Sequence, residues 1–226
     1  MEPRFTRGEY WLLESVVERE YNISGLIGSE HEEHFNKKGH GLTRAPLVET
    51  LHRLLSWGLI YAGSRLRFSD EELDFISTPE QIELALDESK SWVDVPLRDR
   101  KVTYYGLTQE GGDQWEAFAA PNWQKYIAAR VESPDVGECG AGELICADKA
   151  WLEKYFESQC FYNPEVALDS VERDYIAPWD ATYWKQLEGA HRIRFREPDE
   201  SEEENFEPTP WFSDMGYFHR VWCAWR

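Results

Sequence analysis

The feature that most constrains the fold is an apolar stripe that ends at a glycine. Five large apolar residues recur with i, i+1, i+4, i+7 and i+8 spacing, which is typical of an amphipathic helix. Thr43 stands where such a helix can be capped, and Gly58 stands where a left-handed C-terminal cap needs no side chain. A short strand is predicted directly afterwards, over residues 59–62. The residues of the stripe are Leu47, Val48, Leu51, Leu54 and Leu55.

Two capping boxes mark the beginnings of further helices. Thr6 and Glu9 have this spacing, and Thr78 and Gln81 repeat it later in the chain. Loops are predicted over 65–77 and, as a Gly-rich linker, over 133–142, whereas 123–131 fits either a helix or a strand. The predicted helices are 7–20, 79–89, 108–119 and 149–159, and the predicted strands are 101–107, 143–147, 171–176, 191–196 and a closing strand within 215–225.

Two short motifs follow one another in the first half of the chain. Residues 51–60 read Leu-x-x-Leu-x-x-Trp-Gly-Leu-Ile, and residues 104–111 read Tyr-Tyr-Gly-Leu-Thr-Gln-Glu-Gly. This order resembles the PadR-type and MarR-type bacterial regulators, in which a recognition helix turns into the first wing strand and a second wing strand leads into a capped helix. The resemblance covers about residues 5–120. It implies a winged-helix fold with 43–57 as the recognition helix.

The wing of that family is a short hairpin, whereas here about forty residues separate Ile60 from Val102. A predicted helix lies within this stretch, so the wing carries a large insertion. We therefore predict an α+β fold with two domains. Residues 1–131 form a winged helix with an enlarged wing insertion. Residues 132–226 form a smaller, aromatic-rich α+β domain, because the 11 Trp and 11 Tyr must supply much of the core of a chain with few aliphatic residues.

Charge limits the classes of function. The chain has 24 Lys and Arg against 43 Asp and Glu, a net charge of −19. This argues against a nucleic-acid binder held by its bulk charge and against a cationic membrane-surface protein. Residues 1–131 carry a net −7 and residues 132–226 a net −12. The longest uncharged apolar run, 54–64, is too short for a bilayer, and no signal peptide is expected. We expect a cytoplasmic protein with no membrane partner.

A DNA-reading alternative rests on the basic side chains of the half that carries the resemblance. The predicted recognition helix has a local net charge of +1 from Arg44, Arg53 and Glu49, and an acidic run at 70–74 lies inside the wing insertion. Phosphate binding needs a larger positive excess, so charge disfavours nucleic acid. This alternative fails if acidic groups interleave the cations. Its candidate contacts are Arg44, Arg53, Arg65, Arg67 and Lys101.

No pattern in the sequence predicts catalysis. The chain has no GxSxG, P-loop or GxGxxG motif, and its four cysteines form no CxxC pair. His31, His34 and His40 lie among glutamates and are an alternative set of metal ligands, but a polar loop is the preferred interpretation. We predict no enzymatic activity, no catalytic residue, no cofactor and no metal. A hydrolase or nuclease with a carboxylate or histidine metal site is the third hypothesis.

The first interpretation is a non-enzymatic bacterial cytoplasmic module for protein–protein interaction. Residues 197–208 form an acidic loop in the sequence, and Glu202, Glu203 and Glu204 are its candidate contacts for a basic partner. Such a protein would neutralise the partner by covering a positively charged site, in the manner of an immunity protein. The alternative is a winged-helix transcription regulator that places 43–57 in the major groove of DNA.

Overall fold

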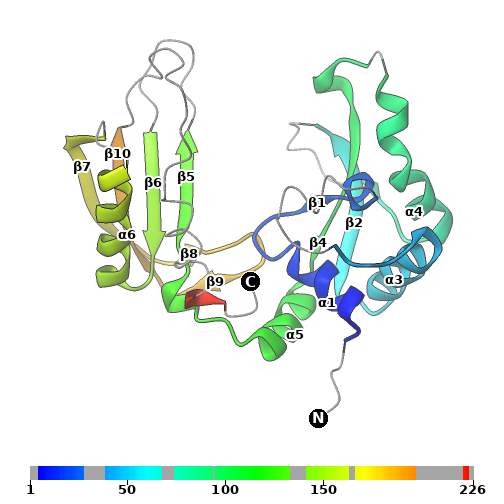
Figure 1. The fold of residues 1–226 in the computed structure, drawn as a ribbon, viewed down its shortest axis with the longest axis horizontal. Coiled ribbons are helices and arrows are strands. Elements are labelled where there is room, and N and C mark those ends of the chain that lie inside the picture. Colours follow the sequence, from blue (N-terminus) through cyan, green and yellow to red (C-terminus); the bar gives the residue numbers. More distant parts are fainter. Residues whose placement is uncertain are drawn as a thin grey trace. The chain divides into compact units, whose positions relative to one another are not determined.

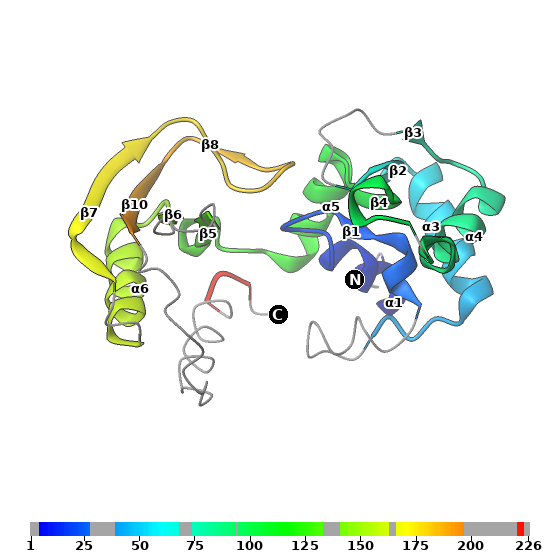
Figure 2. The same ribbon diagram turned by 90° about the horizontal axis from the view of Figure 1, so that it is seen from above.

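The computed structural model of this chain describes residues 5–27, 39–67, 74–93, 95–132, 141–162, 166–196 and 221–223. They form helices and antiparallel sheets, which confirms the predicted α+β class. The chain divides into two compact units, Met1–Phe118 with Thr182–Lys185, and Ala119–Ala181 with Gln186–Arg226. This division falls earlier than the boundary predicted after residue 131. Figures 1 and 2 show the elements of each unit in two views at right angles.

The first helix, α1 (Arg7–Glu14), begins at the predicted capping box. The Thr6 hydroxyl accepts from the Glu9 N–H, and the Glu9 carboxylate accepts from the Thr6 N–H at 2.7 Å. The prediction that this helix runs to residue 20 is wrong: α1 ends at Glu14, and Ser15 is its C-cap. The Ser15 hydroxyl donates to the Leu12 carbonyl at 3.0 Å, which is a local alternative to a helical backbone hydrogen bond.

The amphipathic helix predicted from the apolar stripe is α3 (Arg44–Ser56). Four residues of the stripe are buried and Leu55 is half-buried, so the helix turns the predicted face to the core. Thr43 has the extended backbone of an N-cap, although its hydroxyl makes no capping hydrogen bond among the described residues. Gly58 has a φ of 68°, so the predicted left-handed cap is confirmed.

The sheet of the first unit is antiparallel and has the strand order β1-β4-β2-β3. The two long strands β2 and β4 pair along their whole length, from Ile60 opposite Leu107 to Leu66 opposite Lys101. Strand β2 is longer than the predicted strand 59–62. Its last residues and β3 lie in a segment predicted as loop, because pairing with other strands supplies backbone partners that a polar sequence does not reveal. The strands are β1 (Tyr21–Asn22), β2 (Ile60–Leu66), β3 (Asp74–Phe75) and β4 (Lys101–Leu107).

The connection between β3 and β4 contains the predicted helix, α4 (Pro79–Leu86). Its capping box is formed as predicted: the Thr78 hydroxyl accepts from the Gln81 N–H at 3.3 Å, and the Gln81 side chain accepts from the Thr78 N–H at 3.1 Å. The helix stops at Leu86, and a 3-10 turn follows. Ile82 is fully buried on its apolar face. The 3-10 turns of this unit are η1 (Ile23–Leu26), η2 (Glu88–Trp92) and η3 (Leu97–Asp99).

Helix α5 (Gln109–Ala119) follows β4 directly, as predicted. The Thr108 hydroxyl accepts from the Gly111 N–H at 3.1 Å and donates to the Gly58 carbonyl at 2.6 Å. This one side chain therefore connects the motif at 104–111 to the motif at 51–60. A Cβ atom on Gly111 would overlap the Leu59 carbonyl oxygen. Glycine is therefore required here for the close approach of α5 to the backbone of Leu59, just before β2.

Four residues from late in the chain, Thr182–Lys185, belong to the first unit. The Tyr183 hydroxyl accepts from the Leu107 N–H and donates to the Val16 carbonyl, both at 2.6 Å. A helix that ran to residue 20 would use the Val16 carbonyl in its own backbone ladder. The side chain of Tyr183 takes that place, which is a second reason why α1 ends early.

Trp184 fills the core beside this tyrosine. Its indole N–H donates to the Val17 carbonyl at 2.8 Å, and its ring lies edge-on to Trp115 with 6.3 Å between ring centroids. The Trp115 N–H in turn donates to the Glu14 carboxylate at 2.7 Å. A Cβ atom on Gly112 would overlap the Trp184 ring. The second glycine of the Gly-Gly pair is thus explained by a contact 72 positions along the chain.

The second unit is built on an antiparallel sheet with the strand order β5-β6-β10-β7. Helix α6 (Lys149–Tyr162) lies against one face of this sheet in both views (Figures 1 and 2). The core between them includes Leu144, Leu152, Phe156 and Ile193. The strands are β5 (Ala128–Glu132), β6 (Ala141–Cys146), β7 (Ala167–Ile176) and β10 (Ala190–Arg196).

The predicted helix 149–159 and strands 143–147, 171–176 and 191–196 are confirmed, each with small shifts at its ends. The undecided segment 123–131 contains η4 (Trp123–Lys125) and most of β5. The first eight residues of the predicted linker, 133–140, lie outside the described residues. No helix within the described ranges has the length and hydropathy that a bilayer-spanning segment needs.

An aromatic cluster closes the core of the second unit, in keeping with the predicted aromatic-rich composition. The ring centroid of Tyr126 lies 4.8 Å from that of Trp222 and 6.1 Å from that of Trp179. Val221 and Trp222 have helical backbone, so the predicted closing strand is wrong at these positions, and residues 215–220 and 224–225 lie outside the described residues. A short hairpin, β8 (Trp179–Asp180) with β9 (Gln186–Leu187), completes this unit.

Candidate functional site

The five basic residues predicted as DNA contacts all lie in the first unit. Arg44 is the first residue of α3 and Arg53 lies in its last turn. Arg65 belongs to β2, Arg67 follows it directly, and Lys101 begins β4. Leu66, not Arg65, is the residue opposite Lys101, so strand alternation directs the Arg65 and Lys101 side chains to opposite faces of the sheet.

Arg44 is held by two carboxylates of α4 and its C-terminal cap. Its Nε lies 2.6 Å from Glu83 Oε2, and its terminal nitrogens lie 3.0 and 2.9 Å from the two Asp87 oxygens. The hydrogen bonds from Arg44, together with one from Lys90, lower the pKa of Asp87 to about 2. Asp87 is therefore fully charged at neutral pH and balances the guanidinium that would have to meet a phosphate.

Arg53 is paired with the capping residue of α1. Its Nε and Nη2 both lie 2.9 Å from Glu9 Oε1, and its guanidinium stands 5.6 Å from the centre of the Trp57 ring. Burial by itself raises the pKa of Glu9, but hydrogen bonds from Thr6 and Arg53 outweigh it, and the pKa is lowered. The same carboxylate thus caps one helix and neutralises a cation of another.

The two strand cations are also paired with carboxylates. Arg65 forms an ion pair with Glu20, and its guanidinium lies 4.9 Å from the centre of the Tyr104 ring. Lys101 lies 2.8 Å from Asp74 of β3. The backbone N–H of Arg67 donates to the Arg100 carbonyl at 2.9 Å. Four of the five candidate cations therefore lie against acidic groups of the same unit.

The remaining candidates fall largely outside the described residues. Glu202, Glu203 and Glu204 do so, as do His31 and His34. His40 is described: its Nδ1 accepts from the Leu42 N–H at 3.0 Å, so its Nε2 donates to the Leu26 carbonyl at 2.8 Å. Both ring nitrogens are thus occupied by backbone groups, an arrangement that fits the preferred interpretation of a polar loop.

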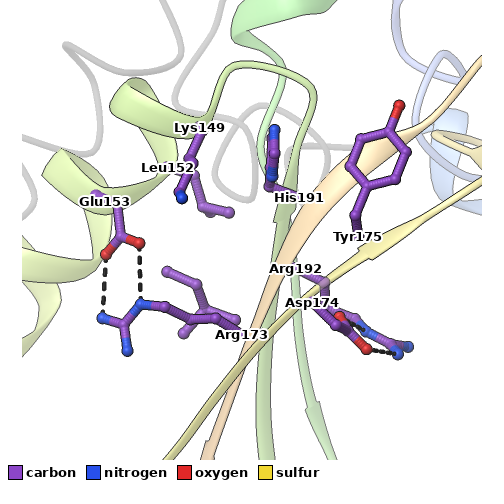
Figure 3. A pocket seen from close by; sticks show the side chains of 9 residues that line it. Lys149, Leu152, Glu153, Arg173, Asp174, Tyr175, His191 and Arg192 are labelled. Carbon is purple, nitrogen blue, oxygen red and sulfur yellow. Dashed lines mark hydrogen bonds and ion pairs between the residues drawn. The ribbon is translucent and has the colours of Figure 1, made fainter.

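A pocket that sequence reasoning missed lies in the second unit, where α6 meets β7 and β10 (Figure 3). Its volume is about 160 Å³. Lys149 and Glu153 lie one turn apart on α6, and therefore on one face of the helix. Arg173 and Tyr175 are two residues apart on β7, and His191 stands opposite Tyr175 on β10, so their side chains share the face of the sheet that α6 covers.

The charged groups around this pocket are unequally matched. The Arg173 guanidinium donates from Nε and Nη2 to the two Glu153 oxygens at 2.9 and 3.1 Å. The hydrogen bond from Arg173 lowers the pKa of Glu153, and the positive charges of Lys149 and His191 lower it further. The Asp174 carboxylate at the edge of the pocket is taken by Arg192 at 2.9 and 2.5 Å. The Glu153–Arg173 pair is internally neutral, whereas Asp174 and Arg192 belong to a larger network of charges with Glu143 and Arg194.

Lys149 and His191 differ from those paired groups. Within the described residues, the Lys149 ammonium has no hydrogen bond or ion pair, and the His191 ring makes only an edge contact with Tyr175, with 5.1 Å between ring centroids. Figure 3 shows Lys149 and His191 between the Glu153–Arg173 pair and Tyr175. No motif marks these two residues, because Lys149 lies on α6 and His191 on β10, and only the packing of the helix on the sheet brings them to one pocket.

Comparison of the chain with protein-family models, with curated proteins and with solved structures finds no match in any of the three.

Proposed function

We propose that this chain is a non-enzymatic protein-binding module rather than a DNA reader. One observation carries the proposal: four of the five cations available for duplex binding hold carboxylates of their own unit. Binding to duplex DNA gains free energy when excess Lys and Arg displace counterions from phosphate. Cations that already hold carboxylates contribute little to that gain, and a net charge of −19 opposes it further.

A winged-helix arrangement of the first unit is part of this proposal. The helix α3, a turn at Gly58, β2 and its partner β4, followed by α5, have the order that the resemblance implies. Recognition helices of such proteins read base edges with their N-terminal residues. Here the first residue of α3, Arg44, is occupied by Glu83 and Asp87 at the insertion between the wing strands. The insertion would thus stand where DNA needs access.

The same insertion offers a surface for a protein. Leu84 and Val93 are each 74% exposed and Leu97 is 47% exposed, and large apolar groups at the surface are more typical of protein contacts than of phosphate contacts. Glu80 lies one turn before Leu84 on α4. Exposed apolar residues with an acidic neighbour favour a basic partner with an apolar patch, which agrees with the net charge.

The test uses the full chain as bait, followed by purification of each captured protein. The proposal expects a basic protein that forms a binary complex of defined stoichiometry when both components are pure. Leu84→Ser should weaken that complex by about 1–2 kcal/mol, as expected for an apolar interface residue. Leu168→Ser is the matched control, because Leu168 is 66% exposed but lies in the second unit. Equal effects of the two variants would contradict this placement of the surface.

A second measurement tests the alternative that the chain binds duplex DNA. Wild-type chain should show no saturable binding to a duplex library at low salt, where phosphate contacts are strongest. The double variant E83Q/D87N leaves Arg44 without its two carboxylates. Saturable binding by this variant alone would identify α4 as a cover over a latent DNA surface. Saturable, salt-dependent binding by the wild-type chain would overturn the proposal.

A further inference from the structure

The half-open pocket between α6, β7 and β10 brings together two nitrogen groups in a strongly acidic protein. The exposed Lys149 makes no hydrogen bond or ion pair among the described residues, and His191 joins it as a second cation when protonated. Glu153 and Arg173, which line the same pocket, are paired with each other through two hydrogen bonds. The pocket is therefore locally positive, although the chain as a whole carries −19.

The donors that face the pocket are of the kinds that bind oxyanions. Lys149 supplies an ammonium and His191 a ring N–H. Charge-assisted hydrogen bonds of this type are among the strongest that a protein makes to an anion.

The size of the pocket limits the occupant. Its volume of about 160 Å³ is below the range of roughly 300–1,000 Å³ in which drug-sized ligands are buried. A single oxyanion or the anionic head of a larger molecule fits this limit. The Tyr175 ring, 58% exposed at the rim, offers an aromatic surface to whatever extends outward.

We propose that this pocket binds a phosphate group, held by Lys149 and His191. A dianion balances Lys149 together with the imidazolium of His191, whereas a monocarboxylate balances only one of them. The phosphate comes from free phosphate or from a small phosphomonoester whose organic part lies on Tyr175. This site does not depend on the protein-binding surface of the first unit, so either proposal can fail alone.

Calorimetric titration of the full chain with inorganic phosphate, sulfate, phenyl phosphate and acetate tests the site. Measurements belong at about pH 6, where histidine side chains carry a substantial fraction of positive charge. Saturable one-to-one binding of phosphate and sulfate, and at least tenfold weaker binding of acetate, is the expected result. Tighter binding of phenyl phosphate than of inorganic phosphate would assign a phosphomonoester, and equal binding would assign the free anion.

Lysine variants on α6 give the matched comparison. Lys149→Gln should weaken phosphate binding about tenfold, as the loss of one charge-assisted hydrogen bond does. Lys154→Gln removes the same charge from the same helix but from a residue that does not line the pocket, and it should change binding less than twofold. His191→Gln provides a second variant that should also weaken phosphate binding. In the wild-type chain, the NMR resonances of the His191 ring should shift when phosphate is added. Equal affinities of the two lysine variants, acetate binding as tight as phosphate, or no saturation would overturn the proposal.

Discussion

Three arginines of the first unit are paired with carboxylates from remote elements, whereas two arginines on the open face of the second sheet are paired with the neighbouring strand. Arg44, Arg53 and Arg65 meet carboxylates that are 39 to 45 positions away in the sequence. On the open face of the second sheet, Arg192 lies opposite Asp174 and Arg194 opposite Glu172 across the β7–β10 pair. The corresponding nitrogen–oxygen distances are 2.5 and 3.0 Å.

This difference shows why net charge is a poor guide to local charge. The second half of the chain is the more acidic by composition, yet it contains the pocket whose Lys149 has no partner among the described residues. The first half is less acidic, yet four of its five candidate DNA contacts are neutralised. Cross-strand pairs cancel charge on the open face of the second sheet. The residues on the face that α6 covers do not take part in these pairs.

Replacement of Trp184 is expected to cause the largest loss in the free energy of unfolding, because this residue makes a remote contact within the first unit. The side chain belongs to a segment far from the rest of the first unit in sequence, and it is 8% exposed. Trp184→Ala removes the hydrogen bond to the Val17 carbonyl and the contact with Trp115, so we expect a loss of about 3–5 kcal/mol in the free energy of unfolding. Guanidinium titration of the wild type and the variant measures this loss.

Trp57→Ala is the matched control for that experiment. Trp57 is 52% exposed in the same unit, so its truncation should cost less than about 1 kcal/mol. Similar losses for the two tryptophan variants would mean that the late segment is not part of the core of the first unit. The contrast between remote and neighbouring contacts would then fail.

Gly112→Ala tests the packing of Trp184 in the first unit, with a smaller expected change in the free energy of unfolding. The added Cβ of Gly112→Ala would overlap the Trp184 ring, and overpacking of a core costs about 1–3 kcal/mol. Without that clash, alanine in a helix would be stabilising relative to glycine. The free energy of unfolding therefore separates the two outcomes by sign. Combining Gly112→Ala with Trp184→Ala should remove most of the penalty, and strictly additive losses would contradict the contact.

The pairing of Arg44 predicts a smaller effect with a defined pH dependence. The pKa of Asp87 is lowered to about 2, so the pair stabilises the fold fully above the ordinary aspartate range. That contribution is lost as pH falls through about 2. Arg44→Gln should lower the midpoint of thermal unfolding slightly at neutral pH, because both groups are exposed and screened by solvent. The difference from wild type should shrink between about pH 4 and pH 2.

Arg98→Gln is the control for this pH series. Arg98 lies 3.7 Å from Asp99 and its side chain is 85% exposed, so its replacement should leave the midpoint nearly unchanged at every pH. A difference between wild type and Arg44→Gln that is as large at pH 2 as at neutral pH would show that Arg44 acts through packing, and not through its carboxylates.

Local chemistry determined much of the fold. The capping boxes at Thr6 and Thr78, the buried stripe of α3 and the positive φ of Gly58 were all predictable, because each depends on residues within a few positions of one another. The predicted strands other than the closing strand within 215–225 were confirmed for the same reason, although the ends of several shifted where a partner strand extended or shortened the pairing.

Only the tertiary structure decided the early end of α1, the assignment of Tyr183 and Trp184 to the first unit, the partners of the arginines and the pocket between α6, β7 and β10. Each of these depends on side chains that are brought together by strand register and core packing across many positions of the chain. Nothing in the sequence indicates that the Val16 carbonyl accepts a hydrogen bond from Tyr183, because neither residue is unusual at its position. Their free energy of interaction exists only once the first unit has closed around them.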